Sequence, residues 1–207
     1  MKSLDACFLY TFVDTGYLCG RDPVLVARQL CEGGSDIIQL RAKDLPPEEI
    51  AVLGARILEI TQTAGVPLVI NDHPEIAREI GAPLAHIGQE DDWEHTVTAG
   101  SFGLSTHAPA QAPPAIAAGA AYIAVGPVYA TPTKPSAKPV TLDYVRWAAA
   151  NVHIPWFAIG GINLENMNEV LAAGAKRICV VSAILTSPEI PRTCQMFKER
   201  LTSAARK

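Results

Sequence analysis

Residues 36–65, DIIQLRAKDLPPEEIAVLGARILEITQTAG, hold one complete copy of the pattern that decides the fold. The first six residues form a short apolar run with β-branched side chains, which is typical of a buried strand. A helical pattern follows over 47–65, with a proline near its first turn and a glycine at its end. A strand followed by a helix is the repeating part of a βαβ unit, so the stretch predicts a parallel sheet.

The same alternation continues along the whole chain. Apolar runs that predict strands lie at 8–13, 36–41, 67–71, 83–88, 101–105, 121–126, 156–160 and 177–182. Helical patterns separate most of them, at 23–34, 47–65, 74–81, 108–119, 142–151 and 164–174, and a last helix is expected at 189–205. Eight strands with intervening helices predict a closed (β/α)₈ TIM barrel, an α/β fold for which about 200 residues is the lower limit of length.

The connection at 89–100, QEDDWEHTVTAG, fits the barrel least well, because it has room for only a short helix. An open doubly wound sheet is therefore the alternative architecture. The 207 residues leave no spare length for a second domain, so we expect one catalytic barrel domain over residues 1–207.

Composition argues against several classes of protein. Hydrophobic residues make up 49% and charged residues 18% of the chain, which indicates a globular, soluble protein rather than a disordered one. The net charge of −4 argues against general nucleic-acid binding. No apolar run approaches the roughly 18–20 residues of a membrane span, and the N-terminal segment MKSLDACFLYTF fits a first strand better than a signal peptide.

The five cysteines, Cys7, Cys19, Cys31, Cys179 and Cys194, form no CxxC pair and are odd in number. This spacing predicts neither a zinc site nor a disulfide framework. We expect reduced and mostly buried thiols in a cytoplasmic protein.

A barrel carries its chemistry at the C-terminal ends of its strands, where the loops converge on one mouth. In the second strand, period-two alternation places Gln39, Arg41 and Lys43 on one face. An amide and two cations on one face are costly to bury unless an anionic or polar ligand meets them. The alternative is that Arg41 and Lys43 are solvated loop charges balanced by Asp44, but this leaves Gln39 unexplained.

Two neighbouring strand ends carry carboxylates. Asn71 and Asp72 follow the third strand, and Gln89 and Asp91 follow the fourth. The two aspartates could bind one hard divalent cation, with water and substrate phosphates in its other positions. Taken alone, each aspartate could instead have a capping role. Asp91 or Asp92 would cap a short helix, and Asp72 would accept hydrogen bonds from loop amides. The two together, beside the cationic second strand, favour a metal and phosphate site.

The remaining strand ends complete the mouth. Ser105 and His107 follow the fifth strand, and His107 is either a general base or a loop hydrogen-bond donor. The segments AIGGIN (158–163) and VVSAI (180–184) offer glycines and exposed amides, which match the backbone phosphate site common in barrels. The loop GPVYATPTKP (126–135) follows the sixth strand, between the two phosphate-binding regions in sequence order. This layout suits the joining of two small phosphorylated molecules, one of which loses diphosphate.

These motifs, in order along nearly the whole chain, resemble those of the thiamine phosphate synthase family. The matching segments are LYTFVD, IIQLRAKDL, VINDHPEIA, HIGQED, GLSTH, YIAVGPVYATPTKP, FAIGGIN and VVSAI. The resemblance implies a (β/α)₈ barrel and a transferase of thiamine biosynthesis that uses Mg²⁺. Members of the family couple 4-amino-2-methyl-5-hydroxymethylpyrimidine diphosphate to a thiazole phosphate and release diphosphate.

The resemblance also implies roles for three groups of residues. The pyrimidine diphosphate would be held by Gln39, Arg41, Lys43, Asn71, Ser105 and Lys134, of which Arg41, Lys43 and Lys134 would stabilise the departing diphosphate. Mg²⁺ would be bound by Asp72 and Asp91. The thiazole phosphate would be held by Thr131 and Thr133 and by the backbone of Gly161, Val181 and Ser182.

Two segments depart from the family pattern. Thr141 lies ahead of a helix where the family commonly has a glycine, and AKRICVV (175–181) replaces a more usual ADG before the eighth strand. Both departures concern the backbone near the thiazole phosphate rather than the reaction.

Two other functions remain open. A thiazole tautomerase is similar in fold but isomerises the thiazole phosphate alone, and His107 would then be the proton-transfer group. A non-catalytic binder would sequester a thiazole or pyrimidine phosphate. The complete set of diphosphate-binding residues favours the synthase, whose partners are small phosphorylated substrates. The sequence is also compatible with a homo-oligomer.

Overall fold

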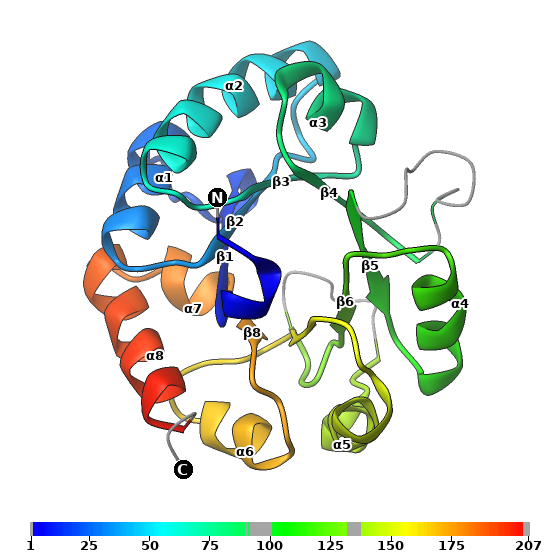
Figure 1. The fold of residues 1–207 in the computed structure, drawn as a ribbon. Coiled ribbons are helices and arrows are strands. Elements are labelled where there is room, and N and C mark those ends of the chain that lie inside the picture. The colour runs from blue at the N-terminus through cyan, green and yellow to red at the C-terminus, as the bar shows by residue number, and fades with distance from the viewer. Residues whose placement is uncertain (1, 90, 92–100, 132–137, 205–207) are drawn as a thin grey trace.

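Eight parallel strands form a closed barrel in this computed structural model, which describes residues 2–89, 91, 101–131 and 138–204 (Figure 1). Each strand is hydrogen-bonded to the next in chain order, and β8 (Ile178–Cys179) closes the ring by pairing with β1 (Leu9–Asp14). The other strands are β2 (Ile37–Arg41), β3 (Leu68–Asn71), β4 (Leu84–Ile87), β5 (Phe102–Thr106), β6 (Tyr122–Val125) and β7 (Trp156–Ala158). The closed ring confirms the predicted (β/α)₈ barrel and eliminates the open sheet.

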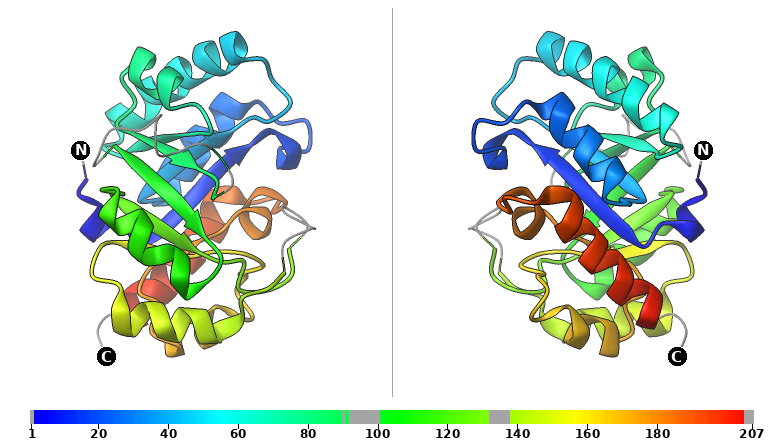
Figure 2. Two further views of the ribbon diagram at one scale, coloured as in Figure 1. Left: turned by 90° about the vertical axis from the view of Figure 1, so that its right-hand side faces the viewer. Right: turned by 90° about the vertical axis from the view of Figure 1, so that its left-hand side faces the viewer.

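Helices cover the outside of the barrel (Figure 2). They are α1 (Pro23–Glu32), α2 (Pro47–Thr63), α3 (Pro74–Ile80), α4 (Ala112–Ala117), α5 (Thr141–Asn151), α6 (Met167–Ala172), α7 (Ser182–Leu185) and α8 (Ile190–Ala204). Short 3-10 turns are η1 (Leu4–Ala6), η2 (Thr15–Tyr17) and η3 (Pro109–Gln111). Prolines lie in the first turns of α1, α2, α3 and α4, where the N–H that proline lacks has no intrahelical partner. None of the described helices is long and apolar enough to cross a membrane.

The eighth strand is shorter than the sequence predicts. The apolar run at 177–182 predicts a strand through Ser182, but β8 ends at Cys179 and Ser182 begins α7. The backbone of Val181 leaves the extended conformation, with φ −108° and ψ −89°. Apolarity alone does not distinguish a strand from the buried start of a helix, so the prediction runs too far. The short helix considered within 89–100 lies almost entirely outside the described residues.

Aromatic side chains fill the barrel interior. The rings of Tyr10, Tyr122 and Phe157 meet edge to face, with centroids 5.2–5.8 Å apart. Gly103 on β5 makes room for them, because a Cβ at this position would lie 2.0 Å from Cζ of Tyr122. The ring layer forms a rigid floor for the polar side chains at the C-terminal ends of the strands.

At the N-terminal ends of the strands, the buried carboxylate of Asp36 holds neighbouring elements together. Its side chain is 1% exposed and forms ion pairs with Lys2 and with Lys198 of α8. It also accepts hydrogen bonds from the backbone N–H groups of Phe8 and Leu9, at 2.9 and 3.0 Å. Burial would raise the pKa of this carboxyl, but the two ammonium groups and the two amides hold it below its ordinary value. Asp36 therefore ties β1, β2 and α8 together.

We expect Asp36→Asn to lower the free energy of unfolding by about 3 kcal/mol at neutral pH, because both ammonium groups lose their buried partner. The pKa of Asp36 is lower in the folded than in the unfolded state, so its contribution is present above the ordinary pKa of aspartate. That contribution is lost as the pH falls through the folded-state pKa. Urea unfolding at neutral pH and near about pH 3 should show the difference between wild type and variant shrinking in acid.

The matched control is Asp143→Asn. Asp143 forms an ion pair with Arg146 at 2.8 Å, but its side chain is 86% exposed. This substitution should change the free energy of unfolding by less than about 1 kcal/mol. Equal effects of the two substitutions would contradict the role assigned to Asp36.

Candidate active site

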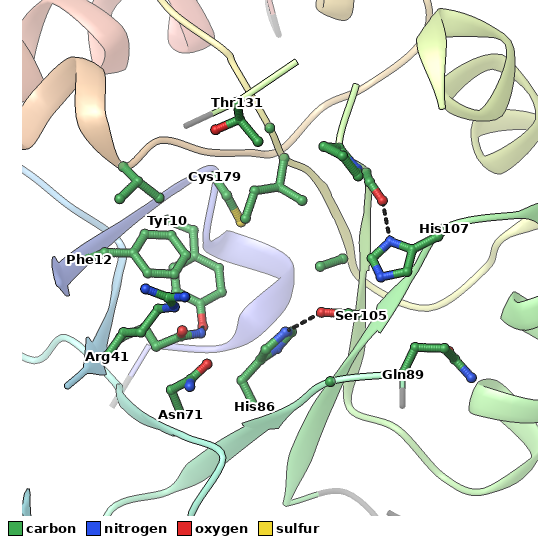
Figure 3. A pocket seen from close by; sticks show the side chains of 18 of the residues that line it. Tyr10, Phe12, Arg41, Asn71, His86, Gln89, Ser105, His107, Thr131 and Cys179 are labelled. Atoms are coloured by element: carbon green, nitrogen blue, oxygen red, sulfur yellow. Dashed lines mark hydrogen bonds between the residues drawn. The ribbon is translucent and has the colours of Figure 1, made fainter. Parts of the chain in front are cut away.

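A cavity of about 310 Å³ opens at the C-terminal ends of the strands (Figure 3). Its walls include residues from all eight strands or the loops that follow them. Every predicted site residue that the structure describes lines this cavity, namely Gln39, Arg41, Lys43, Asn71, Asp72, Asp91, Ser105, Thr131, Gly161, Val181 and Ser182. The other two, Thr133 and Lys134, lie outside the described residues. The alternation predicted for β2 is therefore confirmed, since Gln39, Arg41 and Lys43 all reach the cavity.

The guanidinium of Arg41 is held by the carboxylate of Asp14, a residue for which no role is predicted from the sequence. Arg41 Nη1 donates to Oδ2 of Asp14 at 2.8 Å, and Asp14 is only 1% exposed at the end of β1. The other oxygen of Asp14 accepts from the backbone N–H of Gly16 at 3.1 Å. The pairing of β1 with β2 sets Asp14 directly opposite Arg41. The cation is thus oriented toward the cavity by a partner that is itself fixed.

Lys43 and Asp72 form a second, more exposed pair. Lys43 Nζ lies 3.3 Å from Oδ2 of Asp72. Asp72 adopts φ +63°, a left-handed conformation that aspartate and asparagine tolerate better than most residues. Its N–H donates to the carbonyl of His86 at 2.8 Å, so the pairing of β3 with β4 continues into this turn. A strained residue that faces a cavity is a common feature of functional sites.

The donor set of the cavity fits Mg²⁺. Among the described residues, no three His, Cys, Asp or Glu side chains gather as a metal cage. Mg²⁺ needs no such cage, because it keeps several waters and commonly uses one or two carboxylates with substrate phosphates. Asp72 and Asp91, from the ends of β3 and β4, line the same cavity. Oδ2 of Asp91 accepts from the N–H of Gly88 at 2.9 Å, which orients the carboxylate.

A chain of hydrogen bonds crosses the floor of the cavity. Gln39 Nε2 donates to Tyr10 Oη at 2.6 Å, and Tyr10 Oη lies 2.8 Å from Tyr122 Oη. His86 continues the chain, with Nδ1 3.0 Å from Tyr122 Oη. Its Nε2 lies 3.0 Å from Ser105 Oγ (Figure 3). Burial raises the pKa values of Tyr10 and Tyr122 well above their ordinary range, so both remain neutral phenols. Gln39 and Ser105, two predicted site residues, are therefore physically connected.

The loops after β6 and β7 lie backbone against backbone. The N–H of Tyr129 donates to the carbonyl of Gly160 at 3.1 Å. Gly160 and Gly161 adopt φ +103° and +66°, and a Cβ on them would lie 2.4 Å from Pro127 Cβ and 2.8 Å from Tyr129 Cβ. The two glycines, interpreted from the sequence as a phosphate cradle, therefore also have a packing role, since they let the β6 loop reach the mouth.

His107 and Cys179 also line the cavity, but their surroundings limit their chemistry. His107 Nδ1 donates to the carbonyl of Gly126, which fixes the ring against the end of β6 (Figure 3). Burial raises the pKa of the Cys179 thiol well above its ordinary value, so it is not a thiolate nucleophile at neutral pH. The alternative of His107 as a proton-transfer group stays a prediction.

The predicted site omits four residues that the structure places in or behind the cavity: Tyr10, Asp14, His86 and Tyr122. All four lie within the runs that predict strands or directly at their ends. Period-two alternation, applied to β1 and β4 as to β2, is the signal that could have found most of them. Tyr10 and Asp14 share a face of β1, and His86 lies two residues before Gly88 at the lip of β4.

The closed parallel barrel defines the (β/α)₈ fold. A cavity lined by cations, carboxylates and backbone amides at its C-terminal face defines an enzyme of this fold. A family model described as thiamine monophosphate synthase matches residues 9–184, and the chain belongs to this family. A thiamine-phosphate synthase from Thermus thermophilus is 46% identical over 84% of this chain and 86% of its own length. Another, from Lawsonia intracellularis, is 38% identical over 98% of this chain and 96% of its own.

Solved structures agree with this assignment. The thiamine phosphate pyrophosphorylase from Pyrococcus furiosus superimposes with a TM-score of 0.87 at 25% identity. The match covers 98% of this chain and 99% of that one. The family predicted from the sequence motifs is therefore confirmed.

The departure at Thr141 has a backbone consequence. Thr141 adopts φ +59°, where a β-branched residue is strained and glycine is not. We expect Thr141→Gly to raise the free energy of unfolding by about 1 kcal/mol, because the strain exceeds the value of two long, exposed hydrogen bonds. In these, Thr141 Oγ1 accepts from the Asp143 N–H at 3.3 Å and donates to Asp143 Oδ2 at 3.4 Å. Thr141→Ala is the control, since it removes the hydroxyl but keeps the strain. Urea unfolding measures both, and a Thr141→Gly variant less stable than Thr141→Ala would contradict the expectation.

Proposed function

We propose that the chain couples the hydroxymethylpyrimidine diphosphate to a thiazole phosphate, forming thiamine phosphate and releasing diphosphate. The observation that carries the proposal is the meeting in one cavity of two kinds of anion-binding wall. One wall, on β2–β4, offers Arg41, Lys43 and two carboxylates. The other, after β7 and β8, offers the backbone around Gly161 and Ser182. The names of the relatives support the same reaction.

The β2–β4 wall is the proposed site for the pyrimidine diphosphate. Arg41 can present two parallel N–H donors to phosphate oxygens, and Asp14 holds its orientation. Lys43 adds a flexible cation beside it, and Asn71 offers an amide. In the proposal, Gln39 and Ser105 contact the pyrimidine ring from the floor of the cavity. Lys134 would add a third cation from the β6 loop.

Mg²⁺ would be held by Asp72 and Asp91, and when bound it would neutralise negative charge on the diphosphate. The two carboxylates suit this ion because they supply hard oxygen ligands from neighbouring strand ends. Lys43, 3.3 Å from Asp72, places its charge beside the same position.

The β7–β8 wall is the proposed site for the thiazole phosphate. Gly161 follows β7, whereas Val181 and Ser182 follow the adjacent β8 at the start of α7, so their amides can converge on one phosphate. Thr131 lines the cavity beside them and would add a hydroxyl, with Thr133 as its companion.

The proposed chemistry requires charge stabilisation rather than proton transfer. The C–O bond between the pyrimidine methylene and the diphosphate breaks, and its electron pair leaves with the diphosphate. The thiazole nitrogen then donates its lone pair to the methylene carbon and forms the new C–N bond. Cations at the diphosphate lower the barrier of the first step, and the fixed walls align the two reactants for the second.

We also propose that the enzyme is a single barrel domain of the cytoplasm. All five cysteines are free, in keeping with a reducing compartment.

The decisive experiment is an assay with both substrates, with and without Mg²⁺. The proposal expects thiamine phosphate and diphosphate in equal amounts, only with Mg²⁺ present. A folded protein that does not bind the pyrimidine diphosphate but isomerises the thiazole phosphate would instead be the tautomerase. Tight binding without product over hours would identify a non-catalytic binder.

The metal role of Asp72 has a specific test. Asp72→Asn is the informative change, because asparagine tolerates the left-handed backbone at this position while losing the charge. We expect kcat/KM to fall more than about a hundredfold with little change in stability. Asp44→Asn is the control, since Asp44 is an exposed acid of the β2 loop that does not line the cavity. Comparable losses of activity in both variants would exclude a specific role for Asp72.

A further inference from the structure

Two successive carbonyl groups in the turn after β7 are bound from outside the cavity. The carbonyl of Gly160 accepts from the backbone N–H of Tyr129 at 3.1 Å. The carbonyl of Gly161 accepts from the side-chain Nδ2 of Asn166 at 2.9 Å. Among the described residues, Gly160, Gly161 and Ile162 line the cavity, whereas Tyr129 and Asn166 do not. Both carbonyls therefore point away from the cavity.

The N–H groups of the same two peptides point the opposite way. The peptide bonds from Gly160 to Gly161 and from Gly161 to Ile162 are trans, so each N–H is antiparallel to the carbonyl of its own peptide. The N–H groups of Gly161 and Ile162 thus face the cavity. Within the part of the chain that the structure describes, neither donates to a backbone or side-chain acceptor. Successive N–H groups that face one space form a site for an anion.

The side chain of Asn166 is held in turn by Asn163. Oδ1 of Asn166 accepts from the backbone N–H of Asn163 at 2.9 Å, and the N–H of Asn166 donates to Oδ1 of Asn163 at 3.1 Å. Two independent backbone partners fix the orientation of the Asn166 amide. Its oxygen faces an N–H, which can only donate, and its nitrogen faces the Gly161 carbonyl, which can only accept.

Gly161 needs such an external contact because its own backbone is permissive. It adopts φ +66°, and glycine passes between conformations at little cost. Rotation of the peptide between Gly161 and Ile162 would turn the carbonyl toward the cavity and the N–H away from it. An anion would then meet a carbonyl oxygen, which repels it, in place of a donor.

We propose that Asn166 is a positioning residue for the phosphate of the ligand on the β7–β8 wall. Its hydrogen bond holds the Gly161 carbonyl outward, so that the N–H of Ile162 joins that of Gly161 as a donor before the ligand arrives. A donor that is already oriented costs no reorganisation on binding. This inference rests on the proposed function, in which the β7–β8 wall takes the thiazole phosphate.

Asn166→Asp is the informative substitution. It replaces Nδ2 by an oxygen of similar size, so the Gly161 carbonyl loses its donor, while the other oxygen still accepts from the Asn163 N–H. Calorimetry should show the dissociation constant of the thiazole phosphate rising at least about tenfold. Binding of the pyrimidine diphosphate with Mg²⁺, on the opposite wall, should change less than about twofold. Unchanged affinity for the thiazole phosphate, or equal losses for both ligands, would overturn the inference.

Asn163→Asp controls for the added negative charge. The described contacts of the Asn163 side chain use only its oxygen, which accepts from the N–H groups of Glu165 and Asn166 at 2.8 and 3.1 Å. A carboxylate keeps both bonds and places the same charge in the same turn. Its affinity for the thiazole phosphate should stay within about threefold of wild type. Equal losses in Asn163→Asp and Asn166→Asp would assign the effect to charge and overturn the role of Asn166.

Backbone amide NMR separates this inference from the proposed function. In wild type, the signals of Gly161 and Ile162 should move when inorganic phosphate or the thiazole phosphate is added, and the response of Ile162 should be lost in Asn166→Asp. Silent signals in wild type overturn the inference whether or not thiamine phosphate is formed. Signals that respond to inorganic phosphate in a protein that forms no thiamine phosphate leave the inference standing and overturn only the proposed function.

Discussion

Closure of the sheet between β1 and β8 is the constraint on which the rest of the structure depends. Leu9 pairs with Ile178 and Tyr10 with Cys179, and this short contact removes the last open edges of the sheet. Once the ring is closed, alternate residues of every strand point into one interior. Residues that are distant in sequence, such as Gln39 and Ser105, then share a small volume and can act on the same ligand.

A closed interior also limits what can fill it. Three aromatic rings occupy the floor, and Gly103 is needed because the Tyr122 ring uses the space of its side chain. Polar groups in this layer are cut off from water, so each must find a partner inside the barrel. The hydrogen bonds from Tyr10 to His86 satisfy that demand. Because each buried polar group needs a hydrogen-bond partner, the bonds that stabilise the barrel also fix the orientation of the polar side chains that face the cavity.

The two cations of β2 are held in different ways. Arg41 is paired with a carboxylate that is almost completely buried, which fixes the guanidinium before a ligand arrives. Lys43 is 57% exposed and its partner Asp72 is 30% exposed, so this pair is weak and can rearrange. A fixed cation orients a bound phosphate, whereas a flexible cation can move as the negative charge on the phosphate changes.

The sequence by itself determined the barrel and most of the inward-facing residues at its mouth, because strands and helices have different hydrophobic periods. Period two placed Gln39, Arg41 and Lys43 on one face, and the structure agrees. Only the tertiary structure decided where β8 ends and which partner each inward side chain meets. Asp14 meets Arg41 across a strand pair, and Tyr122 meets His86 across the interior. Such partners depend on strand order and closure, which bring distant residues together, and no local pattern records them.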